Sequence, residues 1–431
     1  MNGSTEHASP SIPSASAPAY SAATLAVHGD DALNSSTDVA PALHVSTTFR
    51  YKENPGELVP VSDYELANGE PGAPPTSDSY IYSRLAAPNT SRLEAILSKL
   101  IGAPSLTYSS GLSAFHALLV WTHPSIVAIG DGYHGCHGVL KIYQKLTNCR
   151  IVDVHDPSSW SGKDEDGKSW ALGKGDLVHL ETPLNPTGEA YEIEKYAGWA
   201  HERGAVLSVD ATFAPPPLQD PFAWGADFVM HSGTKYFGGH SDMLCGVISV
   251  GKKREGWEKD YWGMFQERLF LGAVMGSMEG WLGVRSLRTL ELRVVRQSQN
   301  AEKIVQWLHG LVSGDNGDAD AELVKKTVER VQHSSLQVKQ NSWIEKQMPN
   351  GHGPVFAIWM KDQELAKRLP SKLHLFHHAT SLGGVESLIE WRRMSDDTVD
   401  PRVLRVSVGV ENWEDLKEDL RSAFKALLES K

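Results

Sequence analysis

The sequence predicts an α/β protein with a mostly parallel sheet, followed by a smaller α+β C-terminal domain. Between residues 91 and 250, short apolar runs alternate with amphipathic stretches, as they do in doubly wound sheets. After about residue 320, two strand-like segments and one amphipathic helix close the chain. The 431 residues are enough for two domains and a large core.

The composition is typical of a globular protein and argues against several classes. Apolar residues make up 41% of the chain and charged residues 22%. A net charge of −12 without a long basic block argues against a nucleic-acid or anionic-membrane surface. Cys136, Cys149 and Cys245 follow no paired spacing, and no apolar run reaches the roughly 20 residues of a membrane span. We therefore expect a cytoplasmic protein.

The first 80 residues are expected to lie outside the sheet domains. Residues 1–22 are rich in Ser, Pro and Ala and lack a basic segment, which predicts a disordered tail. Residues 23–80 predict an extended arm and a Gly/Pro-rich connector. A large domain is expected over 81–274 and a smaller one over 275–431.

A helix is predicted to begin at Ser91, which forms a capping box with Glu94, and to end at Gly102. A second helix is expected within KYAGWAHERG, and a long helical region from about Met275 to Leu311. The predicted strands of the large domain are SIVAIGDG, RIVDV, DLVHLETP, AVLSVDATF, DFVMHSG and CGVISV. PVFAIWM, VLRVSVG and a terminal helix capped by Asn412 make up the smaller domain.

Several polar residues follow the predicted strands, where an open α/β sheet binds its ligands. Asp210 ends one strand, and Lys235 follows the next one along the chain. Glu181 and Asn185 follow a third strand, and Tyr133 follows a fourth. Taken singly, each has an ordinary structural explanation: Lys235 could open a loop and extend to solvent, and Asp210 could cap a turn.

Together these residues match the requirements of pyridoxal phosphate. The cofactor needs a lysine for a Schiff base, a carboxylate at the pyridine nitrogen and an aromatic ring to stack on. The segment YSSGLSAF, residues 108–115, is a Ser/Gly turn that opens a helix and offers backbone amides to a phosphate. The ordered occurrence of all these parts predicts a pyridoxal phosphate site.

The chain also resembles the Cys/Met-metabolism family of pyridoxal-phosphate enzymes, which contains cystathionine γ-synthase, γ-lyase and β-lyase and methionine γ-lyase. The resemblance runs from about Thr24 to Leu427. Its blocks include SVDATFAPPPLQDPFAWGADFVMHSGTKYFGGHSD, YIYSRLAAPNTSRLEAIL, YSSGLSAFHALL, ETPLNPTG, SLGGVESLIE and LRVSVGVENWEDLKEDL. It implies fold type I, the aspartate-aminotransferase-like architecture, with 81–274 as the cofactor domain. It also implies a homo-oligomer, either a dimer or a homotetramer built as a dimer of dimers.

The resemblance implies a role for each candidate cofactor residue. Lys235 would form the Schiff base and shuttle protons, Asp210 would pair with the pyridine nitrogen, and Tyr133 would stack on the ring and act near the leaving group. The phosphate would be held by Gly111, Leu112, Ser232 and Thr234, and by Tyr82 and Arg84 of the neighbouring subunit.

For the substrate, the resemblance implies that Arg405 binds the α-carboxylate with help from Asn185 and Ser381. SLGGVESLIE favours γ-elimination or γ-replacement at cystathionine or an O-acylhomoserine, with cystathionine β-lyase as the alternative. Thr380 stands where several γ-type members have a glutamate, which leaves the reaction open. A family member that has lost activity and serves as a binding subunit is a further alternative, as is an oxidoreductase, although no GxGxxG follows the first strand.

Two further motifs depart from the family. HGCH, residues 134–137, contains side chains of the types that bind metal ions. Its spacing is tight and no second ligand pair follows, so no metal is expected. Arg392 and Arg393 stand where the family tends to have a His-Pro run. They could meet a second carboxylate or an acidic O-acyl group, but we favour solvated side chains.

Overall fold

The computed structural model describes residues 20–34, 36–58, 71, 80–314 and 320–429. Residues 1–19 of the predicted disordered tail over 1–22, and most of the predicted connector, lie outside these residues. Within the described ranges, no helix is long and apolar enough to cross a membrane.

The larger sheet has seven strands in the order β1-β9-β8-β7-β6-β2-β3. Neighbouring strands from β8 to β3 run parallel, and only β9 is antiparallel to both of its neighbours. The mostly parallel sheet is thus confirmed. Its strands are β1 (Ser105–Tyr108), β2 (Ile126–Ile129), β3 (Arg150–Asp153), β6 (Leu177–Glu181), β7 (Val206–Asp210), β8 (Phe228–Ser232) and β9 (Gly246–Val250).

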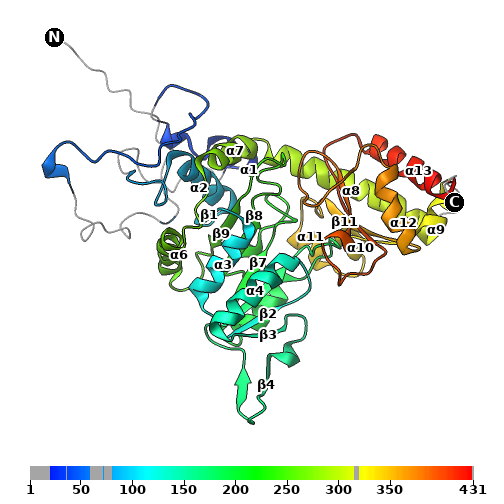
Figure 1. Ribbon diagram of the computed structural model, residues 1–431, viewed down its shortest axis with the longest axis horizontal. Coiled ribbons are helices and arrows are strands. Elements are labelled where there is room, and N and C mark those ends of the chain that lie inside the picture. The colour runs from blue at the N-terminus through cyan, green and yellow to red at the C-terminus, as the bar shows by residue number, and fades with distance from the viewer. Residues whose placement is uncertain (1–19, 35, 59–70, 72–79, 315–319, 430–431) are drawn as a thin grey trace.

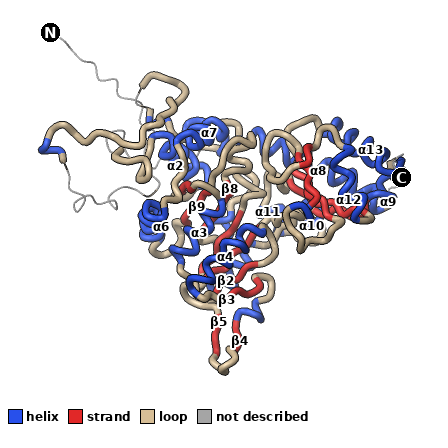
Figure 2. The backbone as a smooth tube through the Cα atoms, in the orientation of Figure 1, coloured by secondary structure: helices blue, strands red, loops and turns tan. Residues whose placement is uncertain are grey.

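Helices cover this sheet, and a small hairpin projects from it (Figure 1). The helices before and within the sheet region are α1 (Ala22–His28), α2 (Pro88–Ile101), α3 (Gly111–Thr122), α4 (His134–Thr147), α5 (Ile193–His201) and α6 (Trp257–Leu271). The hairpin consists of β4 (Ser161–Lys163) and β5 (Ser169–Ala171), seen at the bottom of Figure 2. Most strands of this sheet are buried along nearly their whole length, as expected of strands covered on both faces. They are β1, β2, β6, β7, β8 and β9.

The smaller sheet, at the right of Figure 1, has five strands in the order β10-β11-β14-β13-β12. They are β10 (Val328–Gln332), β11 (Val355–Met360), β12 (His377–His378), β13 (Leu388–Trp391) and β14 (Val403–Ser407), and all pairs but β12–β13 are antiparallel. The remaining helices are α7 (Ser277–Leu287), α8 (Leu290–Ser313), α9 (Ala321–Thr327), α10 (Ser334–Gln337), α11 (Trp343–Gln347), α12 (Gln363–Arg368) and α13 (Trp413–Glu429). This mixed α+β region matches the predicted C-terminal part.

Helix α8 connects the two sheet regions. Its first turns, through Leu290 and Val294, belong to a core that also contains α2 and α7 residues. Its later turns, through Ile304 and Leu308, pack in the core of the smaller sheet. The predicted domain boundary at residue 275 stays a prediction.

The predicted start of the first helix of the large domain is wrong. Helix α2 begins at Pro88, which suits the first helical position, so Ser91 lies inside the first turn and does not cap the helix. Glu94 instead accepts hydrogen bonds from the Thr107 backbone and hydroxyl, at 2.8 and 2.7 Å, and pairs with Arg268. These tertiary partners outweigh the local capping box.

The arm is also not extended throughout. Residues 22–28 form the short helix α1, whose Ala26 is buried. The predicted helical region from Met275 to Leu311 is two helices, with Thr289 as the N-cap of the second. The terminal helix begins as predicted, with the Asn412 side chain accepting from the Glu414 backbone at 3.0 Å.

Candidate functional site

A cavity of about 400 Å³ opens at the carboxyl ends of the parallel strands, between the two sheet regions. Ten of the twelve predicted site residues line it. They are Gly111, Leu112, Tyr133, Asn185, Asp210, Ser232, Thr234, Lys235, Ser381 and Arg405. Residues far apart in the sequence therefore meet at the place that the strand pattern predicted.

Lys235 follows β8 and lies deep in this cavity. Its Nζ donates a hydrogen bond to Ser381 Oγ at 2.7 Å. Burial, together with the nearby Arg405 charge, lowers the pKa of Lys235 to about 8. The side chain is therefore not a solvated loop lysine but a buried amine that can lose its proton near neutral pH.

The loop that meets Lys235 has an unusual backbone. Ser381 has φ +74°, a left-handed conformation that is rare for a residue with a side chain. Gly383 has φ +85°, and a Cβ there would lie 2.9 Å from the Lys235 carbonyl carbon. Glycine is required here because a Cβ would clash with the Lys235 backbone, and its absence lets the loop pack directly against Lys235.

Two carboxylates, Asp210 and Glu181, end neighbouring strands at the cavity wall. They are paired residues in the register of β6 and β7. Asp210 Oδ1 accepts from the Thr212 backbone and hydroxyl, at 3.0 and 2.5 Å. Burial raises the pKa of both carboxyl groups, and the Asp210 charge raises the pKa of Glu181 further.

Glu181 was noted in the sequence but given no task. Its two oxygens accept from the backbone amides of Tyr133, at 2.8 Å, and Asn185, at 2.7 Å. It thereby ties together the loops that hold two predicted site residues. In the sequence, Glu181 ends a predicted strand just as Asp210 does. That position was the feature that could have indicated a role at the site.

The phosphate end of the predicted cofactor site is formed by the start of α3. Ser110 caps this helix by accepting from the Ser113 backbone at 3.1 Å, as the Ser/Gly turn predicted. A Cβ on Gly111 would lie 3.2 Å from Ser232 Cβ and Oγ, so glycine leaves room between the helix end and Ser232. A helix N-terminus, a buried carboxylate and a buried amine in one cavity fit pyridoxal phosphate.

Arg405 lies on β14 at the far wall of the cavity and is 5% exposed. Its guanidinium donates to Asn185 Oδ1 at 3.2 Å and to the Ser381 carbonyl at 2.7 Å. It also pairs with Glu390 Oε2 at 2.6 Å. The three residues predicted for the substrate carboxylate are thus brought together by hydrogen bonds.

Tyr82 and Arg84 do not line the cavity. The Tyr82 side chain is 43% exposed, and the Arg84 guanidinium lies 5.4 Å from the centre of the Tyr82 ring. Of the predicted cofactor-binding residues, these two therefore lie outside the cavity of their own chain.

The expectation of a solvated Arg392 is wrong. Arg392 is 2% exposed, lines the cavity, and pairs with Glu390 at 2.8 Å. Arg393 is exposed, as expected. Sequence reasoning could not separate these adjacent arginines, because burial here depends on how β13 packs against β14.

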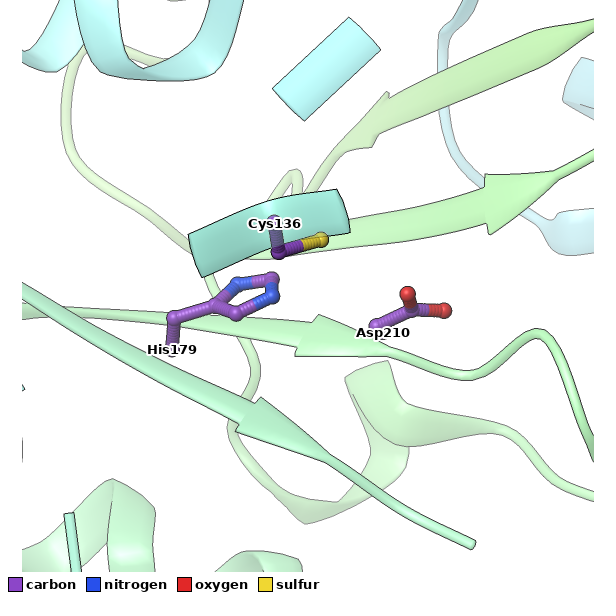
Figure 3. A group of neighbouring side chains, drawn as sticks. All are labelled: Cys136, His179 and Asp210. Carbon is purple, nitrogen blue, oxygen red and sulfur yellow. The ribbon is translucent and has the colours of Figure 1, made fainter. Parts of the chain in front are cut away.

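The cysteine of the HGCH motif does meet other ligand-type side chains. One ligand atom each of Cys136, His179 and Asp210 lies within 4.8 Å of the others, and Figure 3 shows the Cys136 sulfur directed toward the Asp210 carboxylate. Burial, with the Asp210 charge, raises the pKa of the Cys136 thiol well above its usual value, and burial lowers the pKa of His179 to about 3. A metal ion bound here would occupy the Asp210 carboxylate, which is the group expected to pair with the pyridine nitrogen of the cofactor.

Comparisons with known proteins agree with the geometry. Residues 23–425 match the family of Cys/Met metabolism PLP-dependent enzymes. Cystathionine β-lyase of Lactococcus lactis subsp. cremoris is 30% identical over 417 residues, covering 93% of this chain and 98% of that protein. Cystathionine γ-synthase of Escherichia coli is 30% identical over 404 residues, covering 90% and 93%.

The fold leads to the same family. The crystal structure of cystathionine γ-lyase from yeast matches with a TM-score of 0.76 at 28% identity, covering 95% of this chain and 98% of that one. The fold type I architecture that the resemblance implied is thereby confirmed. This chain belongs to the pyridoxal-phosphate-dependent enzymes of cysteine and methionine metabolism.

Proposed function

We propose that this enzyme catalyses γ-elimination or γ-replacement at cystathionine or an O-acylhomoserine. The observation that carries the proposal is the meeting of Lys235, Asp210 and Arg405 in one cavity. The SLGGVESLIE segment favours the γ-type reaction, because it is most similar to γ-type members. Cystathionine β-lyase remains the second candidate, since the Lactococcus relative of that name covers nearly the whole chain.

Pyridoxal phosphate, when bound, withdraws electrons from the α-carbon of an amino acid. Ser232, Thr234 and the α3 N-terminus would hold its phosphate, and Asp210 would keep the proton on its pyridine nitrogen. Tyr133 would stack on the ring. The presence of each of these side chains in the cavity supports the roles that the resemblance implied.

Arg405, with Asn185 and Ser381, would hold the α-carboxylate of the substrate. Lys235 would attach the cofactor in the resting enzyme and then take the proton from Cα. In γ-chemistry Lys235 would also move a proton at Cβ, and Tyr133 would donate a proton to the leaving group at Cγ. In β-elimination the leaving group departs from Cβ, and no proton is removed there.

Product analysis separates the two reactions. The cofactor-loaded enzyme is incubated with L-cystathionine, and the keto acid and thiol are identified by mass spectrometry. We expect 2-oxobutyrate and cysteine, or cystathionine formation when an O-acylhomoserine and cysteine are supplied instead. Pyruvate and homocysteine would replace the proposal with β-elimination. The Lys235→Ala variant serves as the blank.

We further propose that the active site is shared between two subunits, with Tyr82 and Arg84 of one chain completing the phosphate site of the other. Both residues lie outside their own chain's cavity, and Tyr82 is exposed. A homodimer places the same surface of each chain against its copy, so two such sites form together.

Subunit mixing tests the shared site. Lys235→Ala and Arg84→Ala chains, each inactive or weak alone, are unfolded, mixed in equal amounts and refolded. Hybrid dimers contain one intact site, so we expect about a quarter of wild-type activity from the statistical mixture. If the mixture is no more active than the average of its parts, Arg84 acts within its own chain or not at all. Lys235→Ala mixed with Lys235→Ala is the control.

A further inference from the structure

Cys136, His179 and Asp210 form a group that the proposed reaction uses only in part, through Asp210. The three side chains come from α4, β6 and β7, and each is at most 5% exposed. One ligand atom of each lies within 4.8 Å of the others. A thiol, an imidazole and a carboxylate are all donors that zinc takes in proteins.

The larger sheet holds two of these donors on one face. His179 pairs with Ser208 in the register of β6 and β7, and Asp210 lies two residues further along β7, so His179 and Asp210 point to the same side. Helix α4 brings the Cys136 sulfur toward them, as Figure 3 shows. Tetrahedral zinc, with bonds of about 2.0–2.3 Å, places its ligand atoms about 3.5 Å apart. Side-chain shifts of about 1 Å would therefore close the site around an ion.

Neighbouring hydroxyl groups orient two of the donors and leave one atom of each for an ion. His179 Nδ1 lies 3.2 Å from Ser208 Oγ, which orients the ring and leaves Nε2 as the ligand nitrogen. Burial lowers the pKa of His179 to about 3, so the ring is neutral near pH 7, which is the form that binds metals. Thr212 donates both of its hydrogen bonds to Asp210 Oδ1, so Oδ2 remains for a ligand.

The surroundings of the group offer both space and negative charge. A second cavity of about 10 Å³, a volume that a single water can fill, is lined by Cys136 and His179. Tyr133 and Glu181 line both this cavity and the cofactor cavity, so the three donors meet at the wall between the two. Burial, and then the charges of Asp210 and Glu181, raise the pKa of the Cys136 thiol. A divalent cation would offset these charges and replace the thiol proton.

We propose that the cofactor-free chain binds one zinc ion through Cys136, His179 and Asp210, and that zinc and pyridoxal phosphate exclude each other. When the ion binds, a zinc–sulfur bond forms and the thiol proton passes to solvent. Three protein ligands leave one tetrahedral position, which a water molecule fills. The exclusion rests on the proposed pairing of Asp210 with the pyridine nitrogen, because zinc and the protonated nitrogen are both positive and need the same oxygen. The zinc site itself does not depend on the reaction that the enzyme catalyses.

Calorimetric titration of the full-length apoenzyme with zinc chloride tests the site. We expect one ion per chain and the release of at least one proton per ion, which is measured by repeating the titration in buffers of different ionisation enthalpy. Cadmium is the spectroscopic probe, because a cadmium–thiolate bond gives an ultraviolet charge-transfer band. Both measurements use the wild-type chain, so they do not depend on the folding of a variant. A wild-type apoenzyme that binds no zinc, or that binds cadmium without the band, would overturn the proposal.

Two cysteine substitutions locate the ion. Cys136→Ser should weaken zinc binding at least about tenfold, because a neutral hydroxyl replaces the thiolate ligand. Cys136 does not line the cofactor cavity, so cofactor affinity should stay within about threefold of wild type. Cys149→Ser is the matched control, since Cys149 is also 2% exposed but lies outside the group, and it should bind zinc as the wild type does. Equal zinc affinity in Cys136→Ser and the wild type would place the ion elsewhere and contradict the proposal.

Cofactor titration measures the exclusion. Binding of pyridoxal phosphate to the apoenzyme is followed by its visible absorbance, with zinc present at about ten times its Kd. We expect the apparent Kd of the cofactor to rise about tenfold in the wild type, as competition gives, and to change little in Cys136→Ser, which also corrects for zinc bound by free cofactor. If zinc binds the wild type and leaves cofactor affinity unchanged, the exclusion is wrong. Failure of the proposed γ-chemistry is seen separately, in the products from cystathionine, since neither titration needs turnover.

Discussion

Lys235→Ala is expected to reduce turnover at least about 10⁴-fold, because one side chain would supply both the covalent attachment of the cofactor and the proton transfers. The buried amine has no substitute in the part of the cavity described here: Arg405 stays protonated, and the neighbouring carboxyls occupy another wall. Steady-state rates with the best substrate measure the loss. Reduction with borohydride, followed by mass spectrometry, should attach the cofactor to Lys235 in the wild-type enzyme and nowhere in the variant.

Lys361→Ala is the control, because it removes an exposed lysine that does not line the cavity. It should leave both the rate and the labelling unchanged. Retained turnover in Lys235→Ala would remove the basis of the proposed mechanism. A wild-type protein whose visible spectrum matches that of Lys235→Ala would favour an inactive binding subunit.

The features that the sequence predicted well are those fixed by local pattern. A parallel strand buried on both faces needs a continuous apolar run, and a polar residue directly after such a run lies at the ligand-binding edge. Asp210 and Lys235 satisfy this rule, and the structure brings both into one cavity. The Ser110 cap and Gly102, with φ +77° after α2, likewise follow from residue type alone.

The features that the sequence missed depend on packing between distant segments. Ser91 and Glu94 have the spacing of a capping box, but Glu94 finds Thr107 and Arg268, and the helix starts earlier at Pro88. β1 and α6 were not predicted, since β1 is only a four-residue edge strand. Helix α6 has no clear apolar stripe and buries only part of its surface.

The site was predicted in the same uneven way. Tyr133 and Asn185 were found, but the residue that fixes both backbones, Glu181, was given no role. Glu390 and Arg392 were missed because their burial arises only where β13 pairs with β14, after a sequence segment that departs from the family pattern. A single sequence does not show which of two adjacent arginines turns inward.

Arg405→Ala should raise KM for amino-acid substrates at least about 30-fold and change kcat far less. The guanidinium is buried and hydrogen-bonded, and truncating such a charge costs about 2–5 kcal/mol when its partner stays in place. Glu390 keeps Arg392 as a partner in this variant, so the fold should survive. Initial rates over a range of substrate concentrations separate KM from kcat, and cofactor affinity, measured by titration of the apoenzyme, should change little.

Arg402→Ala is the matched control. Arg402 lies three residues from Arg405 in the same segment but pairs at the surface with Glu329 and Asp400, outside the cavity. Its loss should leave KM within about twofold, because surface ion pairs contribute little. If Arg405→Ala lowers kcat and leaves KM unchanged, Arg405 stabilises a later state of the reaction and does not bind the substrate carboxylate. If it weakens the cofactor as much as the substrate, its hydrogen bonds to Asn185 and Ser381 hold the site together, and the α-carboxylate must bind elsewhere in the cavity.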